Sequence, residues 1–192
     1  LTSDLINLHF EAINNISSKI SENETEANLY FKRSLEFALV QDFHSAIEDL
    51  NKTLSMNQNF ALAYFSRANI RYKLVEYMKS TAAENAVNSN ENNIDLNKRL
   101  SIENKNKFEV EMIMRDYDKV IELQPNFAFA YYNKANILCT QKDYRTAISN
   151  FSKAIECDAD FAEAYFNRGL TYIFIGQDTL GLADLSKAGE LG

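Results

Sequence analysis

The chain has 192 residues, 46% of them hydrophobic, and its 27 acidic and 20 basic residues give a net charge of −7. This mildly acidic balance, without a run of like charges, argues against a protein that binds the phosphates of a nucleic acid. No apolar run approaches the roughly 18 residues of a membrane-spanning helix, so we expect no membrane insertion. Five glycines and one proline favour long helices.

The start of the chain does not predict a signal peptide, because LTSDLINLHFEAINN has neither a basic beginning nor a continuous apolar segment. Leu1 in place of an initiating Met indicates an excerpt of a longer protein, and a targeting signal could precede it. The compartment therefore stays open, with the cytoplasm as the default expectation.

Residues 1–26 are predicted to form an N-terminal capping helix. When HFEAINNISSKI (9–20) is aligned with FHSAIEDLNKTL (43–54), their apolar positions coincide. We therefore expect a helix over about residues 4–21 that replaces the second half of a degenerate repeat. It would cover the apolar face of the first complete hairpin, which spans 27–60 and turns at Gln41-Asp42.

Residues 61–127 form a block about twice as long as the others, because an insertion lies near 79–106. The insertion is not a hidden fifth repeat, since Ser80, Glu84 and Val87 would take the twentieth, twenty-fourth and twenty-seventh positions of a repeat over 61–94 and cannot form its buried spine. We favour two helices that extend the hairpin, with a loop near Asn88–Asn93. The alternative is a disordered loop, which the Asn-, Glu-, Lys- and Ser-rich composition alone would predict.

Residues 128–161 give the clearest hairpin, and residues 162–192 repeat it. Within each half the apolar and small residues recur every three or four positions, which is the spacing of one helix face. Neither helix can bury its apolar stripe alone, so each hairpin needs a neighbour. We expect the last hairpin to lack a C-terminal capping helix, which leaves the leucines of its second helix uncovered.

The hairpins repeat with a period of about 34 residues and share residue types at fixed positions. The fourth position is always tyrosine: Tyr30, Tyr64, Tyr131 and Tyr165. The eighth is small: Ser34, Ala68, Ala135 and Gly169. The twentieth is Ala46, Ile113, Ala147 and Gly181, and the twenty-seventh is Thr53, Val120, Ala154 and Ala188. Small side chains allow helices to approach to about 8–10 Å. This pattern resembles the tetratricopeptide repeat (TPR), although the family's late proline survives only as Pro125.

The resemblance covers roughly residues 27–192 apart from the insertion, and it implies an all-α, right-handed superhelix of four hairpins, one of them elongated. It also implies a concave groove, lined by the first helix of each hairpin, that binds a peptide or protein segment. The candidate groove residues are Phe31, Lys32, Phe65, Asn69, Tyr132, Asn133, Asn136, Phe166 and Asn167. Asparagine amides both donate to and accept from a peptide backbone, and aromatic rings give apolar contact. Alternatively, the rings are partly buried within the stack.

A basic series occupies the seventh position of the four hairpins: Arg33, Arg67, Lys134 and Arg168. One interpretation is that these side chains lie along the helices with their charged heads in water. The other is that they bind an acidic partner. Some TPR proteins hold the C-terminal carboxylate of a chaperone peptide with a lysine at the fifth position. That position is aromatic in every hairpin here, so we do not expect chaperone-tail binding.

No residue pattern predicts catalysis, a cofactor or a metal site. The sequence has no glycine-rich phosphate loop, no Ser/His/Asp arrangement and no carboxylate pair in an apolar setting. Its two histidines and two cysteines have no metal-ligand spacing. Cys139 and Cys157 are expected near opposite ends of a hairpin, roughly 15 Å apart along its axis and too far for a disulfide.

The sequence therefore predicts a non-catalytic scaffold whose groove binds a peptide or protein of unknown identity. The alternative is a structural module that self-associates, including a homodimer formed through the C-terminal end, by its uncapped last helix or its projecting hairpin. A fold shared by proteins with many different functions does not identify the partner.

Overall fold

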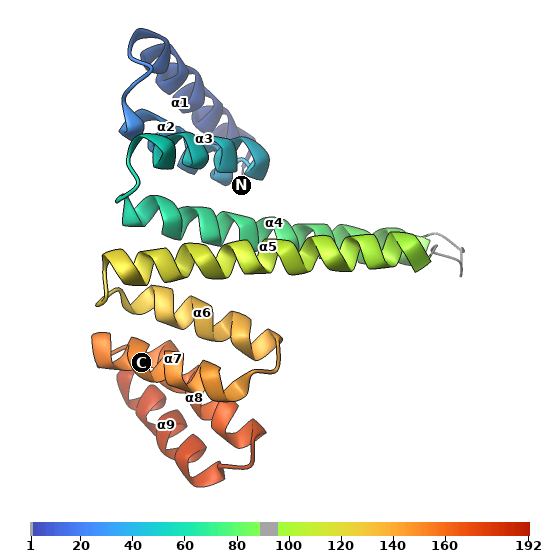
Figure 1. Ribbon diagram of the computed structural model, residues 1–192, viewed down its shortest axis with the longest axis vertical. Coiled ribbons are helices and arrows are strands. Elements are labelled where there is room, and N and C mark those ends of the chain that lie inside the picture. Colours follow the sequence, from blue (N-terminus) through green and yellow to red (C-terminus); the bar gives the residue numbers. More distant parts are fainter. Residues whose placement is uncertain (1, 89–95) are drawn as a thin grey trace. The chain divides into compact units, whose positions relative to one another are not determined.

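The computed structural model describes residues 2–88 and 96–192, with side chains described over 2–81 and 104–192. These residues form helices and connecting turns, and no strand occurs among them (Figure 1). The helices are α1 (Ser3–Glu22), α2 (Ala27–Leu39), α3 (Phe43–Met56), α4 (Ala61–Asn88), α5 (Leu96–Leu123), α6 (Ala128–Thr140), α7 (Tyr144–Cys157), α8 (Ala162–Phe174) and α9 (Asp178–Leu191). The predicted all-helical architecture is confirmed. Within the described ranges, no helix combines the length and apolar character needed to cross a membrane.

The chain divides into two compact units, Leu1–Asp116 and Tyr117–Gly192. The first contains α1–α4 and most of α5, and the second contains the end of α5 and α6–α9. In each unit, helices that follow one another in the chain pack together. The first helices of adjoining hairpins also meet, α2 with α4 and α6 with α8.

The core of the first unit lies between α2, α3 and α4. Ala46, Leu50 and Ala63 are fully buried in one cluster, together with Phe43 and Ile70. A second cluster joins α1 to α2, where Ile20 of α1 packs with Leu29 and Tyr30. The apolar stripe of α1 thus covers α2 in the manner of a second helix of a hairpin.

The core of the second unit follows the same plan. Ala154 of α7 and Ala164 of α8 are fully buried, and they cluster with Ala128 and Phe161. The side chains at these contact points are small because the helices approach closely.

Each short hairpin turns through a residue with positive φ at the fifteenth position. Gln41 and Lys142 both have φ 64°, and Gly176 has φ 80°. The next residue caps the second helix in two of these turns, because Asp42 accepts from the amide of Ser45 and Asp143 accepts from the amide of Thr146. The sequence thus stops one helix and starts the next within a few residues.

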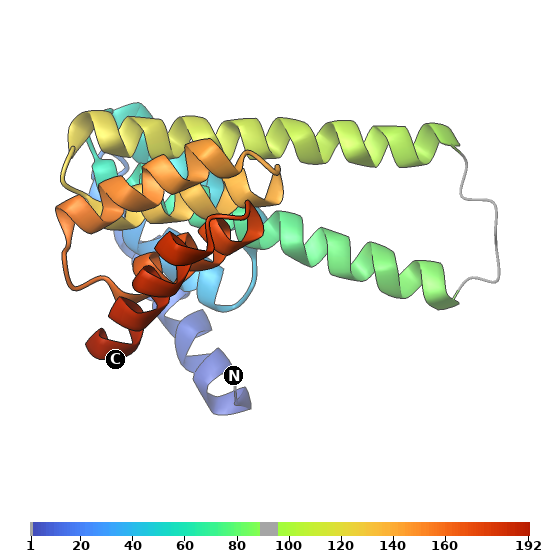
Figure 2. The same ribbon diagram turned by 90° about the horizontal axis from the view of Figure 1, so that it is seen from below.

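The insertion lengthens both helices of the second hairpin. Helices α4 and α5 have 28 residues each, against 13 or 14 in the helices of the other hairpins (Figure 2). Of the two alternatives, extended helices are present over 79–88 and 96–106. The loop predicted near Asn88–Asn93 falls, after Asn88, outside the described residues. Arg71 and Glu109 connect the two helices by an ion pair of 3.3 Å.

Candidate functional site

Three of the four basic side chains at the seventh position form paired hydrogen bonds with an aspartate. The pairs are Arg33–Asp49, Arg67–Asp116 and Arg168–Asp184, joined through Nε and Nη2 at 2.6–2.8 Å. All three aspartates are buried. Because the arginine lies on the first helix of a hairpin and the aspartate on the second, each pair fixes the two helices against each other.

The same arginines also reach the helix before them in the chain. Through Nη1, Arg33 donates to Ser17, Arg67 to Asn51 and Arg168 to Ser152, at 2.9, 2.7 and 2.9 Å and sixteen residues back in each case. One guanidinium therefore joins three helices. Lys134 makes only the contact with the preceding helix, where it donates to Asp118, sixteen residues earlier. The aspartate position of its own hairpin holds Asn150.

Both interpretations of the basic series need correction. The heads of Arg33, Arg67 and Arg168 are each held in an ion pair with a buried aspartate, and that of Lys134 pairs at the surface with the exposed Asp118. They also form no unpaired cationic row for an acidic partner. The aspartates that pair with the arginines lie 16 or 49 residues away in the sequence, so the pattern of basic residues does not reveal the ion pairs.

The tyrosines at the fourth position hold the guanidinium groups from another side. Arg33 lies over the ring of Tyr30, with 5.7 Å to the centroid, and Arg168 lies over Tyr165 at 5.6 Å. The hydrogen bond to Asp49 raises the pKa of Arg33, and that to Asp184 raises the pKa of Arg168. These tyrosines are therefore structural.

In the first unit, the candidate groove residues lie on α2 and α4. Phe31 is half-buried because the ring of Phe60 covers it at a centroid distance of 4.7 Å. Phe65 and Asn69 are also half-buried, while Lys32 is exposed. Partial burial of the rings, the alternative reading of the aromatic row, therefore describes Phe31 and Phe65.

In the second unit, three candidate residues meet in one hydrogen-bond network. Asn167 of α8 donates through Nδ2 to the Tyr132 hydroxyl at 3.0 Å and to Asn136 Oδ1 at 2.9 Å, both on α6. All three side chains are half-buried, as is Asn133. The network fixes the amide of Asn167 and leaves its Oδ1 as an acceptor beside the Nδ2 donor of Asn136.

Beside this network lies a cavity of about 570 Å³, lined by Tyr132, Ala162, Glu163, Phe166, Asn167, Leu185, Ala188, Gly189 and Gly192. Tyr132, Phe166 and Asn167 were candidates from the sequence. The wall formed by α9 was not, although Ala188 had been recognised as a close-packing position. Phe166 is 48% exposed, which makes it the most accessible aromatic ring of the four fifth positions.

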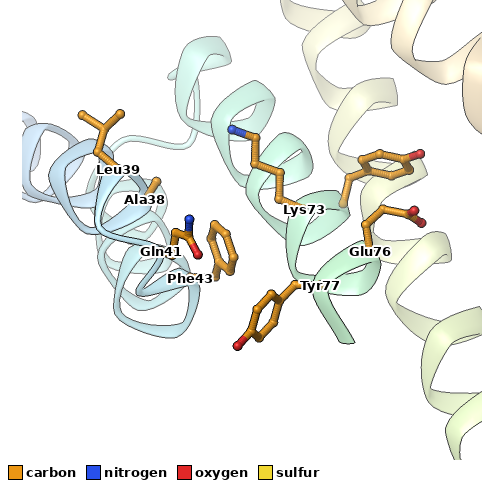
Figure 3. A pocket seen from close by; sticks show the side chains of 8 residues that line it. Ala38, Leu39, Gln41, Phe43, Lys73, Glu76 and Tyr77 are labelled. Carbon is orange, nitrogen blue, oxygen red and sulfur yellow. The ribbon is translucent and has the colours of Figure 1, made fainter. Parts of the chain in front are cut away.

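A second cavity, of about 430 Å³, lies in the first unit between the α2–α3 turn and α4. Figure 3 shows Gln41 and Phe43 on one side of it and Lys73, Glu76 and Tyr77 on the other. Glu76 and Tyr77 form this wall because α4 continues beyond the length of the other first helices. In the second unit, the ring of Phe174 covers Tyr144 at 4.7 Å. Lys73 stands at the position equivalent to Phe174, and Phe43 instead makes an edge contact with the ring of Tyr77, at 6.3 Å between the centroids.

Two exposed leucines lie on α9, where Leu180 and Leu182 are 52% and 62% exposed, and α1 and α2 also carry two each. Phe174, at the end of α8, is 70% exposed. These side chains lie outside the lining of the larger cavity.

Metal and thiol chemistry find no support in the described part of the chain. No group of three His, Cys, Asp or Glu side chains is placed to hold a metal there. Both cysteines are free. Burial raises the pKa of the Cys139 and Cys157 thiols, so both are weaker nucleophiles than an exposed cysteine.

Two family models match the chain. A model described as "TPR repeat" matches residues 135–173, and one described as "Tetratricopeptide repeat" matches residues 116–149. No curated protein matches the chain in sequence.

Solved structures with a similar fold include MamA, with a TM-score of 0.71 at 17% identity over 93% of this chain and 85% of that one. A MamA fragment from Desulfovibrio magneticus RS-1 gives 0.71 at 14% identity, over 95% and 85% of the two chains. TTC0263, a thermophilic TPR protein of Thermus thermophilus, gives 0.65 at 12% identity, over 96% and 83%. At these identities the likeness shows the fold alone.

Proposed function

We propose that this chain, a tetratricopeptide-repeat protein and hence a protein-interaction scaffold, binds a peptide or protein segment and has no catalytic role. The proposed binding surface is the face of α6 and α8 around Tyr132, Asn136, Asn167 and Phe166. The corresponding residues of the first unit, Phe31, Lys32, Phe65 and Asn69, are proposed as a further contact surface.

The observation that carries this proposal is the double donation from Asn167 to Tyr132 and Asn136. A peptide backbone offers one donor and one acceptor per residue. The fixed amides present a complementary acceptor on Asn167 and donor on Asn136. Because the network holds these groups in place before binding, less side-chain entropy is lost when a peptide arrives.

The surroundings indicate the side chains that such a peptide carries. The exposed ring of Phe166 offers an apolar contact, and Glu163 lies at the same cavity. A segment with an apolar residue next to a basic one would suit both, in a chain whose overall charge is −7.

The proposal is tested by screening an array of short random-sequence peptides and titrating the best binders by fluorescence anisotropy. Asn167→Ala and Asn136→Ala should each weaken binding roughly fivefold, because each removes a hydrogen bond worth about 1 kcal/mol. Asn126→Ala, in the exposed α5–α6 linker, is the control and should bind as the parent does. A best binder that is indifferent to both groove variants would refute the proposed surface.

Self-association is the second candidate function, and the exposure of Leu180 and Leu182 favours it. Analytical ultracentrifugation over a hundredfold concentration range would detect it as a rising mass. The mass should then return to that of a monomer in a Leu180→Ser, Leu182→Ser variant. A constant monomer mass would exclude self-association over that range and leave the α6–α8 surface as the working site.

A further inference from the structure

A short sequence motif introduces three of the first helices in this chain. Residues 60–67 read FALAYFSR, residues 127–134 read FAFAYYNK, and residues 161–168 read FAEAYFNR. The shared pattern is Phe-Ala-x-Ala-Tyr-x-x-Arg/Lys. In each case the phenylalanine immediately precedes the first helical residue, Ala61, Ala128 or Ala162.

In the second unit, the phenylalanine and the second alanine of the motif fit into the hairpin before them. Phe161 and Ala164 are buried against Ala128 and Ala154, with Tyr132 and Ile155 packed alongside. The rings of Phe161 and Tyr132 are 4.8 Å apart. The hairpin α6–α7 thus presents a socket, formed by Ala128, Tyr132, Ala154 and Ile155, that receives a Phe-Ala-x-Ala helix start.

The first unit shows the same arrangement. Phe60 covers Phe31 at 4.7 Å, and Ala63 is fully buried in the cluster that contains Leu50. Both occupied sites therefore have an aromatic side chain over the fifth-position ring and an alanine pressed against the helix pair.

The cavity of about 570 Å³ is the same socket in the hairpin α8–α9. One repeat period further along the chain, Ala128, Tyr132, Ala154 and Ile155 correspond to Ala162, Phe166, Ala188 and Gly189. All four of these later residues line the cavity. Leu185, which is equivalent to the buried Leu50, lines it as well. The cavity has the chemistry of the occupied sockets, and Phe166 is 48% exposed whereas a phenylalanine ring covers each of the equivalent Phe31 and Tyr132.

The basic end of the motif also has an acceptor here. Arg33, Arg67 and Arg168 each donate to a residue of the preceding helix that stands at the twenty-fifth position of the repeat frame, namely Ser17, Asn51 and Ser152. In α9 that position is Ser186, which is exposed. An incoming helix with Arg or Lys in the motif's last place would therefore find a hydroxyl acceptor at Ser186.

We propose that the cavity between α8 and α9 is a docking socket for another polypeptide whose helix begins with Phe-Ala-x-Ala-Tyr-x-x-Arg/Lys. This inference rests on the proposed function in one respect, because it names a partner class for the interaction scaffold. The socket shares Tyr132, Phe166 and Asn167 with the proposed groove and adds a wall formed by Leu185, Ala188 and Gly189 of α9.

The test uses the full chain and a fluorescein-labelled synthetic peptide with the sequence of residues 160–174, followed by anisotropy. The expected result is saturable binding that weakens at least about tenfold when the peptide's phenylalanine at position 161 is replaced by alanine, because a buried Phe side chain is lost. Replacing the peptide's arginine with alanine, or Ser186→Ala in the protein, should weaken binding by a smaller factor.

Gly189→Trp in the protein should abolish binding by filling the socket, because its side chain is much larger than that of Ile155 at the equivalent position of the occupied socket. A Cβ at Gly189 meets no atom within 4 Å, so this variant should fold, and its circular dichroism spectrum and Tm verify that. Gly189→Ala is the size control and should retain most binding. Binding that is absent, or that is unaffected by Gly189→Trp, would overturn the proposal, because the second result places the peptide at another socket.

Two further readouts separate this socket from the groove and from self-pairing. Ser186→Ala should weaken binding of the motif peptide while it leaves binding of the groove peptides unchanged, so either proposal can fail alone. A chain that dimerises without peptide and becomes monomeric with Gly189→Trp would show that a second copy occupies the socket, which would overturn the proposal of a separate partner.

Discussion

Asp49 accepts both Nε and Nη2 of Arg33, and only a small part of its side chain, 7%, is exposed to solvent. Removal of the carboxylate would leave a largely enclosed guanidinium without its main partner. Arg33 keeps 20% exposure, which lets water compensate in part. Asp49 therefore contributes to stability in two ways. It forms the ion pair, and it accepts hydrogen bonds from an enclosed guanidinium that would otherwise lack a partner.

Asp49→Ala is expected to lower the free energy of unfolding by about 2 kcal/mol. Urea unfolding followed by circular dichroism measures this as a shift of the midpoint. Glu76→Gln is the matched control from the same unit, because Glu76 and Lys79 form an exposed ion pair in which each side chain is about half exposed. It should change the midpoint very little. Equal effects of the two variants would contradict a structural role for Arg33–Asp49.

The pH dependence of this effect follows from the pKa of Arg33, which the hydrogen bond to Asp49 raises. A cation with a raised pKa in the folded state contributes stability that is complete below its unfolded pKa and is lost only as the pH rises through the folded one. The ordinary guanidinium pKa lies far above neutrality, so the cost of Asp49→Ala should be constant from pH 6 to 9.

At the scale of the helices, α8 and α9 approach each other closely in the second unit. A Cβ built on Gly181 would lie 2.5 Å from Ile173 Cγ1 and 2.7 Å from the backbone oxygen of Gly169. The side chain of Ile173 can move, but the oxygen belongs to the helix backbone. The two helices would have to separate to admit even a methyl group.

Gly181→Ala is therefore expected to destabilise the protein by about 1–2 kcal/mol, although alanine favours a helix by about 1 kcal/mol over glycine. Gly189→Ala provides the comparison on the same helix, since a Cβ there has open space. It should stabilise by about 0.5–1 kcal/mol. Thermal unfolding of both variants gives the two signs, and a gain from Gly181→Ala would show that the close approach is not maintained.

Small residues such as Gly169, Gly181 and Ala154 made the helix pairs predictable, because a repeated small side chain indicates a repeated close contact. The Arg–Asp pairs were harder to predict. A spacing of sixteen residues matches no helix-face rule, and the insertion separates Arg67 from Asp116 by 49 residues. The α8–α9 cavity exists because the ring of Phe166 is left partly uncovered, and a periodic pattern of residue types does not show which rings are covered.

At the scale of the whole chain, we propose that the repeats span 27–60, 61–127, 128–161 and 162–192, after the capping segment 1–26. The stability of a stacked array is approximately the sum of repeat terms and nearest-neighbour terms. An arginine at the seventh position contributes to both, since it binds an aspartate in its own hairpin and a polar residue in the helix before it. This accounts for its recurrence in three of the four repeats.

The third repeat lacks the pair within its own hairpin, and this absence leads to the last prediction. Lys134 donates to Asp118 of the preceding helix, while Asn150 occupies the aspartate position and donates to the Thr146 carbonyl at 2.8 Å. A variant with Lys134→Arg and Asn150→Asp would recreate the arrangement of Arg33 with Asp49. A guanidinium can bind the new carboxylate with two donors and keep Asp118 within reach of the third nitrogen, which a lysine ammonium cannot do as well.

The double variant is expected to gain about 1 kcal/mol of stability, with a favourable coupling energy in a double-mutant cycle. Asn150→Asp alone should gain less, because Lys134 would then be shared between two carboxylates without the paired geometry. Lys134→Arg alone should be near neutral. Chemical denaturation of the four proteins measures the cycle. If the effects of Lys134→Arg and Asn150→Asp on stability were merely additive, the spacing between the seventh and twenty-third positions would not by itself determine an Arg–Asp pair. The helices of the third repeat would then be held in a register that keeps the two side chains apart.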